Sequence, residues 1–315
     1  MKLLISRRLP DTVMATAAAR FDMTCRQTTL PMTPDDCVAA LGDYDVVIPT
    51  LGDAFGAASF AAVPSPRCRL LANFGVGYNH IDVAAASAEG IAVTNTPGAV
   101  TDATADIALT LILMTARRAG EGERLLRSGG WTGWHPTQML GMHVTGRTVA
   151  IIGMGRIGQA IARRCHFGFG CRIVYASRSP KTLDFPAEAM GLEAALGVAD
   201  IVVLAVPATP QTRHMMDAGM LAAMQPHAIL VNIARGDVVD ETALIAALRA
   251  GVIAGAGLDV YEFEPAVPDA LIAMENVTLL PHLGTAALEV REAMGCMALD
   301  NVIALAEGRD LPNPV

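Results

Sequence analysis

The stretch that decides the fold is VAIIGMGRIGQAIARR, residues 149–164. It reads as an apolar strand, then the glycine pattern Gly153-Met154-Gly155-Arg156-Ile157-Gly158, then a helix. Gly153 permits a tight turn, Gly155 lets the backbone approach a pyrophosphate, and Gly158 lets the helix pack closely on the strand. A pattern of this kind alone has many chance matches, but a strand before it and a helix after it predict a dinucleotide site.

Short apolar runs recur along the chain, with helix-like stretches between them. The strands predicted from these runs are 2–6, 45–49, 69–73, 91–95, 148–153, 172–176, 201–206, 228–233, 256–260 and 277–281, and the helices 101–119, 156–167, 241–250 and 286–307. Most runs are continuously apolar, as expected for parallel strands covered by helices on both faces. The alternation predicts a doubly wound α/β protein with two domains, which a length of 315 residues can supply.

Composition excludes several classes of protein. With 31 Asp and Glu against 23 Lys and Arg, the net charge is -8, and no basic block suggests binding to nucleic acid or to an anionic membrane. The longest apolar stretch, 107–116, is too short for a membrane span of about 20 residues. The six cysteines lack metal-ligand spacing, so we expect reduced thiols, no metal and a cytoplasmic location. The start MKLLISRRLP has too short an apolar run for a signal peptide.

The end of the strand that follows the glycine pattern bears on the choice of dinucleotide. An NAD site usually carries Asp or Glu there, which accepts hydrogen bonds from the ribose. This chain has Ala176 instead, followed by Ser177, Arg178 and Ser179. A guanidinium between two hydroxyls suits a 2′-phosphate, so we expect NADP(H) to be favoured and NAD(H) to remain possible.

Three separated polar residues carry the predicted chemistry. Arg235 follows the run 228–233, Glu264 comes after 256–260, and His282 stands directly after 277–281. Ligands of such sheets bind at the carboxyl ends of the strands, so the three side chains are expected at one edge. An Arg can hold a carboxylate, and a His oriented by a carboxylate is a natural proton donor. Taken singly, each could also be an ordinary surface or strand-end residue.

Six segments together resemble the D-isomer-specific 2-hydroxyacid dehydrogenase family over essentially the whole chain. They are NFGVGYNHID (73–82), TNTPGAVTDATADIAL (94–109), VAIIGMGRIGQAIARR (149–164), NIARGDVVDETAL (232–244), AGLDVYEFEP (256–265) and LLPHLGT (279–285). Within the family the chain is most similar to glyoxylate/hydroxypyruvate reductases, with 2-ketogluconate reductases close behind. The resemblance implies reduction of a small 2-oxo acid to the D-2-hydroxy acid by a homodimer.

The resemblance also implies roles for individual residues. Arg235 would hold the substrate, His282 would be the acid/base and Glu264 its partner, and the amides of Val76 and Gly77 would bind the substrate carboxylate. Together with the glycine pattern and the loop after Ala176 described above, the positions expected to contact the dinucleotide are Thr104, Gly153, Gly155, Arg156, Ile157, Gly158, Ser177, Arg178, Ser179, Val206, Pro207, Thr212, Ile233, Ala234, Asp259 and Gly284.

Two further residues keep alternatives open. Trp134 matches a tryptophan that reaches the neighbouring subunit's site in hydroxypyruvate reductases, but it could equally anchor its own loop. His80, beside the loop of Val76 and Gly77, is expected to support that loop or lie at the surface rather than act in catalysis.

Family topology implies a discontinuous arrangement of two domains. Residues 1–98 and 287–315 would form a flavodoxin-like substrate domain, and a Rossmann dinucleotide domain of residues 99–286 would be inserted into it. One rival activity is that of a formate dehydrogenase, but that enzyme pairs its active-site His with Gln, and Glu264 argues against it. A rival of another class is a nucleotide-sensing protein similar to the C-terminal-binding corepressors, which turnover would distinguish.

Overall fold

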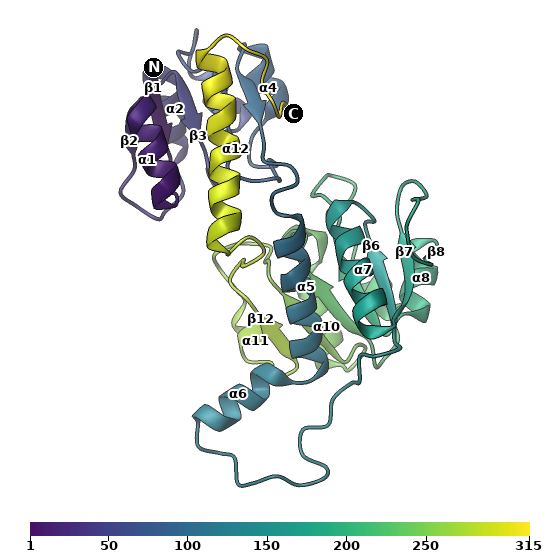
Figure 1. Cartoon of the computed structure of the whole chain (residues 1–315). Helices are drawn as coiled ribbons and strands as arrows, with labels where there is room; N and C mark the ends of the chain where they lie inside the picture. Colours follow the sequence, from purple (N-terminus) through teal and green to yellow (C-terminus); the bar gives the residue numbers. More distant parts are fainter. The chain divides into compact units, whose positions relative to one another are not determined.

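The computed structural model describes all residues from 1 to 315. The contacts divide the chain into two compact units, which are described separately below. Unit 1 comprises residues 1–100 and 285–315, and unit 2 comprises residues 101–284. Both contain a sheet of parallel strands between helices, so the predicted α/β class with two parallel-sheet domains is confirmed (Figure 1).

Unit 1 has a five-stranded sheet in the order β2-β1-β3-β4-β5. Its strands are β1 (Lys2–Ile5), β2 (Asp22–Cys25), β3 (Val46–Ile48), β4 (Leu70–Ala72) and β5 (Ala92–Thr94). Its helices are α1 (Asp11–Arg20), α2 (Pro34–Asp43), α3 (Ala57–Ala61), α4 (Val83–Ala88) and α12 (Leu288–Ala306).

Successive residues of β1, β3 and β4 enter different cores, which is why these three strands are almost entirely apolar. Leu3 and Ile5 pack with residues of α1 and α12 on one face of the sheet. Leu4 packs with residues of α2, α3 and α4 on the other face. Because strand side chains alternate between faces, a sheet covered on both sides needs an apolar residue at every position.

Unit 2 has a seven-stranded sheet in the order β12-β11-β10-β9-β6-β7-β8. Its strands are β6 (Thr148–Ile152), β7 (Arg172–Ala176), β8 (Glu188–Ala189), β9 (Ile201–Leu204), β10 (Ile229–Asn232), β11 (Gly255–Leu258) and β12 (Val277–Leu279). Its helices are α5 (Thr101–Ala116), α6 (Ala119–Arg127), α7 (Arg156–Phe169), α8 (Leu192–Val198), α9 (Ala218–Ala222), α10 (Glu241–Arg249) and α11 (Asp269–Ile272), with a 3-10 turn η1 at Gly236–Val238.

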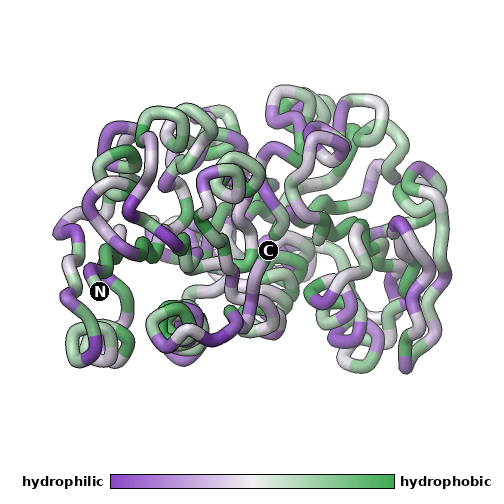
Figure 2. Tube along the Cα trace, turned by 90° about the horizontal axis from the view of Figure 1, so that it is seen from above, coloured by the Kyte–Doolittle hydropathy of each residue, from purple (hydrophilic) through white to green (hydrophobic).

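The helices of unit 2 also cover both faces of their sheet. Helices α5 and α7 lie side by side over one face (Figure 1), and their buried residues share a core with Val149 and Ile151 of β6. Helices α8, α9 and α10 cover the other face, where Ala150 and Ile152 are buried. Hydrophobic and hydrophilic residues accordingly alternate over short distances along the trace (Figure 2).

Two expectations need correction. The predicted helix 101–119 is two helices, because Arg118 adopts a left-handed conformation (φ 53°) between α5 and α6 and its guanidinium binds Glu121 at 2.6 Å. The strands β2 and β8 were not predicted; they are edge strands with exposed polar residues, so no apolar run marks them. None of the helices is long and apolar enough to cross a membrane.

Candidate active site

The three predicted catalytic residues lie at one edge of the sheet in unit 2. Arg235 follows β10, Glu264 follows β11 and His282 follows β12, and these strands are neighbours in the sheet. Because the strands are parallel, their carboxyl ends face the same side. The glycine pattern after β6 opens at that same edge, two strands beyond β10.

His282 and Glu264 form a direct pair. The Nδ1 atom of His282 lies 2.8 Å from Oε2 of Glu264, and the other carboxylate oxygen accepts a hydrogen bond from the Tyr261 N–H at 3.0 Å. Burial works to raise the pKa of Glu264, but His282, the Tyr261 N–H and Arg235 together hold that pKa below its usual value. Glu264 is therefore ionised near neutral pH and accepts a hydrogen bond from the Nδ1–H of His282, which leaves Nε2 of His282 for other chemistry.

Arg235 is a partly buried cation with unused donors. Burial lowers the pKa of its guanidinium, while the charges of Glu264 and Asp237 oppose that shift. One terminal nitrogen donates to the Ala234 carbonyl at 2.7 Å, and the buried Nε has no partner. The loop is shaped by Asn232, whose side chain donates to the Arg235 carbonyl and accepts from the Ala234 N–H. A buried guanidinium with an unpaired N–H suits an anionic ligand.

The loops that carry Arg235 and Glu264 touch through their backbones. A Cβ atom placed on Gly236 would lie 1.8 Å from the Tyr261 carbonyl carbon and 2.2 Å from the Glu262 nitrogen. Only a glycine permits so close an approach. The position of Glu264 is thus coupled directly to that of Arg235.

Three residues that the sequence did not reveal support these two loops. The buried Glu241 accepts a hydrogen bond from the Glu262 N–H at 2.9 Å. Burial, together with the nearby charges of Glu262 and Glu264, raises the pKa of Glu241. The hydrogen bond from the Glu262 N–H opposes that shift. The Glu262 carboxylate lies 2.7 Å from Nε2 of His214. The local sequence does not mark these residues, because their contacts join positions 48 and 21 residues apart in the chain.

Asp259, Thr104 and Gly284 form a connected group beside His282. The buried Asp259 carboxylate accepts hydrogen bonds from the N–H groups of Leu283 and Gly284, at 2.6 and 2.8 Å. The Thr104 hydroxyl donates to the Gly284 carbonyl at 3.1 Å. Burial raises the pKa of Asp259, although the two N–H groups and His282 counteract that shift. These predicted cofactor residues fix the chain that continues from His282.

The glycine pattern has the local structure that a dinucleotide requires. Gly153 adopts φ 101°, and a Cβ there would lie 2.6 Å from the Ala205 carbonyl oxygen. A Cβ on Gly158 would lie 2.1 Å from the Gly153 oxygen, whereas Gly155 has open space around its Cβ position. No side chain caps the start of α7, so the N–H groups of Arg156 and Ile157 have no capping partner. The residues therefore fit a pyrophosphate.

The other predicted cofactor residues lie at the carboxyl ends of neighbouring strands. Val206, Pro207 and Thr212 follow β9, and the Thr212 hydroxyl donates to the Pro207 carbonyl at 2.7 Å. Ile233 and Ala234 follow β10 directly and are buried.

The loop after β7 is exposed and basic. Ser177, Arg178 and Ser179 are all exposed. Lys181, which was not predicted, also belongs to this loop. Its Nζ donates to the Ser179 hydroxyl at 2.9 Å, and the backbone N–H of Lys181 donates to the Tyr175 hydroxyl at 3.1 Å. Two cations and two hydroxyls thus gather where an NAD site usually has one acid.

Val76 and Gly77 lie in unit 1, after β4. The carbonyls on either side of Val76 are bound by Asn73, and His80 Nε2 lies 3.0 Å from the Asn73 side-chain oxygen. His80 therefore supports this loop through Asn73.

Trp134 belongs to residues 128–147, which contain no helix or strand. Its side chain is 78% exposed. Such exposure leaves it without the packing on its own subunit that a loop anchor would have.

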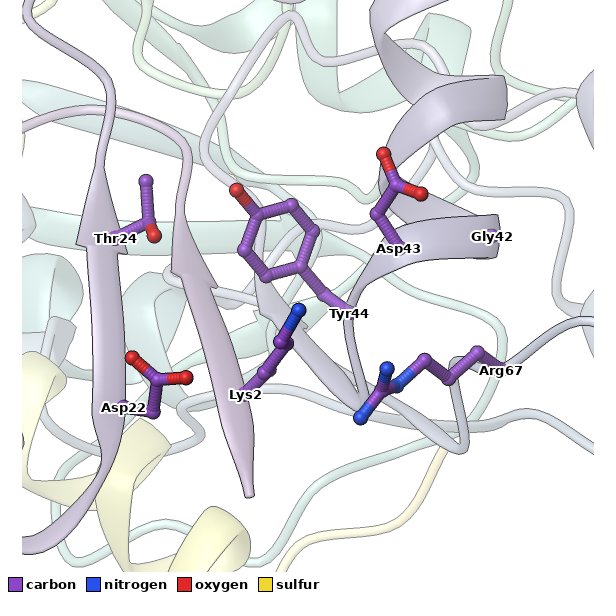
Figure 3. Close-up of a pocket in the computed structure, with 7 residues that line it drawn as sticks. All are labelled: Lys2, Asp22, Thr24, Gly42, Asp43, Tyr44 and Arg67. Atoms are coloured by element: carbon purple, nitrogen blue, oxygen red, sulfur yellow. The ribbon is translucent and has the colours of Figure 1, made fainter.

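Two hollows lie away from these groups. One in unit 1, of about 430 Å³, is lined by Lys2, Asp22, Tyr44 and Arg67 at the amino ends of the strands (Figure 3). The other, of about 660 Å³ in unit 2, also lies at the amino ends of strands, beside α5. Both are therefore at the edge opposite to the one where ligands of such sheets bind.

Comparisons with known proteins agree with this geometry. Residues 109–284 match a family model described as "D-isomer specific 2-hydroxyacid dehydrogenase, NAD binding domain". The chain is 43% identical to a glyoxylate reductase of Thermococcus onnurineus over 321 residues, which cover 100% of this chain and 95% of that protein. Identity to a glyoxylate reductase of Thermococcus kodakarensis is 44%, with 100% and 96% covered.

A solved structure is similar over the same length. It is the NADPH-dependent glyoxylate/hydroxypyruvate reductase of Sinorhizobium meliloti in complex with NADP and malonate. The TM-score is 0.87 and the identity 35%, with 100% of this chain and 96% of that chain covered. The motif resemblance is thereby confirmed, and this chain belongs to the D-isomer specific 2-hydroxyacid dehydrogenase family of oxidoreductases.

Proposed function

We propose that this protein reduces a small 2-oxo acid of the glyoxylate or hydroxypyruvate type to the D-2-hydroxy acid, with NADPH favoured over NADH. The observation that carries the proposal is the His282–Glu264 pair at 2.8 Å, on the sheet edge that also holds Arg235 and the glycine pattern. The full-length relatives named above are glyoxylate reductases, which supports the choice of substrate.

Arg235 would bind the substrate acid and polarise its carbonyl. Its guanidinium is buried, and an ion pair is stronger where water is excluded. A planar guanidinium can contact the carboxylate and the neighbouring 2-oxo group together, which fixes the carbonyl for reduction. Positive charge beside the carbonyl oxygen also stabilises the negative charge that develops there.

His282 would supply the proton. When bound, the cofactor supplies the hydride that adds to the substrate carbonyl carbon. The imidazolium of His282, held through Nδ1 by Glu264, gives its Nε2 proton to the carbonyl oxygen and becomes neutral. The product hydroxyl thus forms without a metal, because Arg235 and His282 provide the positive charge.

We assign the substrate-binding role to unit 1 and the dinucleotide-binding role to unit 2. The amides of Val76 and Gly77 would bind the substrate carboxylate, and the malonate complex of the Sinorhizobium reductase shows that a similar protein accepts a small carboxylate. Thr104, Asp259 and Gly284 would hold the nicotinamide end of the cofactor, and the start of α7 its pyrophosphate.

The preference for NADPH rests on the loop after β7. With NAD(H), Ala176 offers no acceptor to the ribose; with NADP(H), Arg178 and Lys181 can pair with the 2′-phosphate. One ionic hydrogen bond contributes roughly 1.5–3 kcal/mol, or about ten- to a hundredfold in affinity.

Steady-state kinetics test this proposal. Glyoxylate, hydroxypyruvate and 2-ketogluconate are each assayed with NADPH and NADH, in the parent and in the Arg178→Ala and Ala176→Asp variants. We expect glyoxylate or hydroxypyruvate to be reduced best. NADPH should be preferred at least about tenfold in the parent, and Arg178→Ala should lose most of that preference by raising the KM for NADPH. Ala176→Asp should shift preference toward NADH because the acid repels the phosphate.

Absence of turnover with every acid would instead favour a nucleotide-sensing protein. Equal efficiency with the two cofactors in the parent would refute the proposed role of the loop after β7.

We further propose a homodimer built on α6 and residues 128–147. Helix α6 has no buried residue, and a helix of 9 residues is marginal without a partner to cover it. Four large apolar side chains are exposed there, namely Leu126, Trp131, Trp134 and Leu140. A second copy of the chain that covers them would remove this apolar surface from water, and Trp134 would then reach the partner's site. Light scattering of the parent and of a Trp131→Ser, Leu140→Ser variant tests this, since the variant should be monomeric.

We also propose a cytoplasmic location, because the six cysteines are free thiols and a reducing compartment keeps thiols in that state. Burial raises the pKa of Cys37, Cys68 and Cys165 to about 12, so these residues act as small apolar side chains rather than as reactive groups.

A further inference from the structure

We propose that Asn73 is a positioning residue for substrate binding: its side-chain amide binds the Gly75 carbonyl and so sets the orientation of the Gly75–Val76 peptide, which presents the Val76 N–H to the substrate carboxylate beside the Gly77 N–H. The inference rests on the carboxylate-binding role proposed above for these two amides. No other side chain of the loop makes as many contacts with its backbone.

Asn73 is a buried polar residue with every group of its amide engaged. It directly follows β4 and is 1% exposed. The side-chain nitrogen donates to the carbonyls of Gly75 and Gly77, at 3.0 and 3.1 Å. The side-chain oxygen lies 3.0 Å from Nε2 of His80. Since a primary amide has only two N–H groups, each is committed to one loop carbonyl.

The carbonyls of the loop determine where its N–H groups point. In a trans peptide the C=O and the following N–H point in opposite directions. Asn73 and the Thr96 N–H bind the Gly75 carbonyl, which turns the Val76 N–H away from Asn73. The Asn95 side chain binds the Val76 carbonyl at 2.9 Å and so turns the Gly77 N–H outward.

The result is a loop whose acceptors are satisfied and whose donors are not. The N–H groups of Val76 and Gly77 donate to no acceptor within the chain. Successive N–H groups that point to one side form an anion-binding concavity. Asn73, through the Gly75 carbonyl, and Asn95, through the Val76 carbonyl, hold that arrangement before substrate arrives, so less ordering is needed on binding.

An aspartate at this position would have the same size and the opposite effect. Its carboxylate has no N–H to give, and it would face two carbonyl oxygens with negative charge. The Gly75 carbonyl would then keep only the Thr96 N–H as a donor, so the Gly75–Val76 peptide would be held less firmly. The effect should fall on binding of the acid, since the residues proposed for hydride and proton transfer are not part of this loop.

The experiment compares Asn73→Asp and Asn73→Ser with a matched control, Asn301→Asp. Asn301 is also a fully buried asparagine of unit 1, but its side chain binds Met297 and Asn313 and shares no partner with Asn73. For each enzyme one measures the KM for glyoxylate, kcat, the KM for NADPH, inhibition by malonate, and Tm.

We expect Asn73→Asp to raise the KM for glyoxylate and the inhibition constant of malonate at least about tenfold, a change worth about 1.4 kcal/mol. The KM for NADPH should stay within about twofold and kcat within about threefold. Asn73→Ser keeps one hydrogen-bond donor, so its KM for glyoxylate should lie between those of the parent and of Asn73→Asp. Because serine is uncharged, this variant can be used for the test if Asn73→Asp does not fold. Asn301→Asp should lower Tm without changing the KM for glyoxylate.

Two outcomes would overturn the inference. One is an unchanged KM for glyoxylate in both Asn73 variants. The other is a rise in the KM for NADPH as large as the rise in the KM for glyoxylate. Val76→Pro separates this failure from failure of the proposed carboxylate site, because it deletes one loop N–H and leaves Asn73 in place. If Val76→Pro leaves the KM for glyoxylate unchanged, the carboxylate site itself is wrong. If Val76→Pro raises that KM and neither Asn73 variant does, only the role of Asn73 is wrong.

Discussion

Gly236→Ala adds one methyl group at the point where the loops of Arg235 and Glu264 touch. The new Cβ would lie 1.8 Å from the Tyr261 carbonyl carbon, whereas ordinary contact begins near 3.4 Å. The two backbones would therefore have to separate by about 1.6 Å, as the difference between these distances requires. No side-chain rotation can relieve the clash, because the atoms that are met belong to the backbone.

The separation should damage catalysis more than stability. A misplacement of about 1 Å between reacting groups costs roughly a hundredfold in rate. Overpacking of this kind costs about 3 kcal/mol, which at roughly 2–4 °C per kcal/mol lowers Tm by about 6–12 °C. We expect kcat/KM for glyoxylate to fall at least about a hundredfold, while NADPH binding changes little because the glycine pattern is untouched.

The assay combines steady-state kinetics, NADPH fluorescence titration and thermal unfolding. The matched control is Gly168→Ala, where a Cβ in the helix α7 would meet nothing within 4 Å. That variant should keep the parent's kcat/KM and gain about 0.5–1 kcal/mol of stability. A Gly236→Ala enzyme with more than a third of the parent's kcat/KM would refute the coupling of the two loops.

Three further predictions concern single residues of the site. Arg235→Lys keeps the charge but loses the planar guanidinium that can bind the acid through two hydrogen bonds, so kcat/KM for glyoxylate should fall at least about tenfold with the KM for NADPH unchanged. A kcat/KM close to that of the parent would show that Arg235 does not bind the substrate in this way. Because the pKa of Glu264 is held below its usual value, its ionic pairing stabilises the native state at neutral pH and is lost as pH falls through that lowered pKa. The Tm difference between the parent and Glu264→Gln should therefore be largest near pH 7 and vanish in strong acid; a difference independent of pH would contradict this. Gly158→Ala would place a Cβ 2.1 Å from the Gly153 oxygen, so the KM for NADPH should rise at least about tenfold, as kinetics with varied NADPH will show.

The central strands and the site edge were predictable because their signal is local. A strand covered on both faces is apolar at every position, so β6, β9 and β10 stand out as continuous runs. The predicted ends of β9 and β10 extended one or two residues too far. Ala205 continues the apolar run after β9, and the buried Ile233 continues the one after β10, so apolarity persists where pairing has stopped.

What escaped prediction depends on contacts of polar side chains, several of them between distant residues. Nothing near Asn73 in the sequence shows that its amide will bind two carbonyls of the next loop. The pairing of His214 with Glu262 joins residues 48 apart, and Glu241 meets the Glu262 N–H across 21 residues. Polar side chains of this kind are placed by tertiary structure, and their local sequence carries no periodic signal.

The return of α12 to unit 1 has a consequence for biosynthesis. The Thr12 hydroxyl in α1 donates to Glu292 in α12, 280 residues further along the chain, and Ala298 and Leu299 complete the core that contains Leu3. While residues 101–284 are being translated, one apolar sheet face of unit 1 is therefore covered by α1 alone. Unit 2, whose core comes from one continuous segment, can finish folding first, although its synthesis begins second. Until α12 is synthesised, the apolar residues that it covers stay exposed, and such surface favours aggregation of the nascent chain.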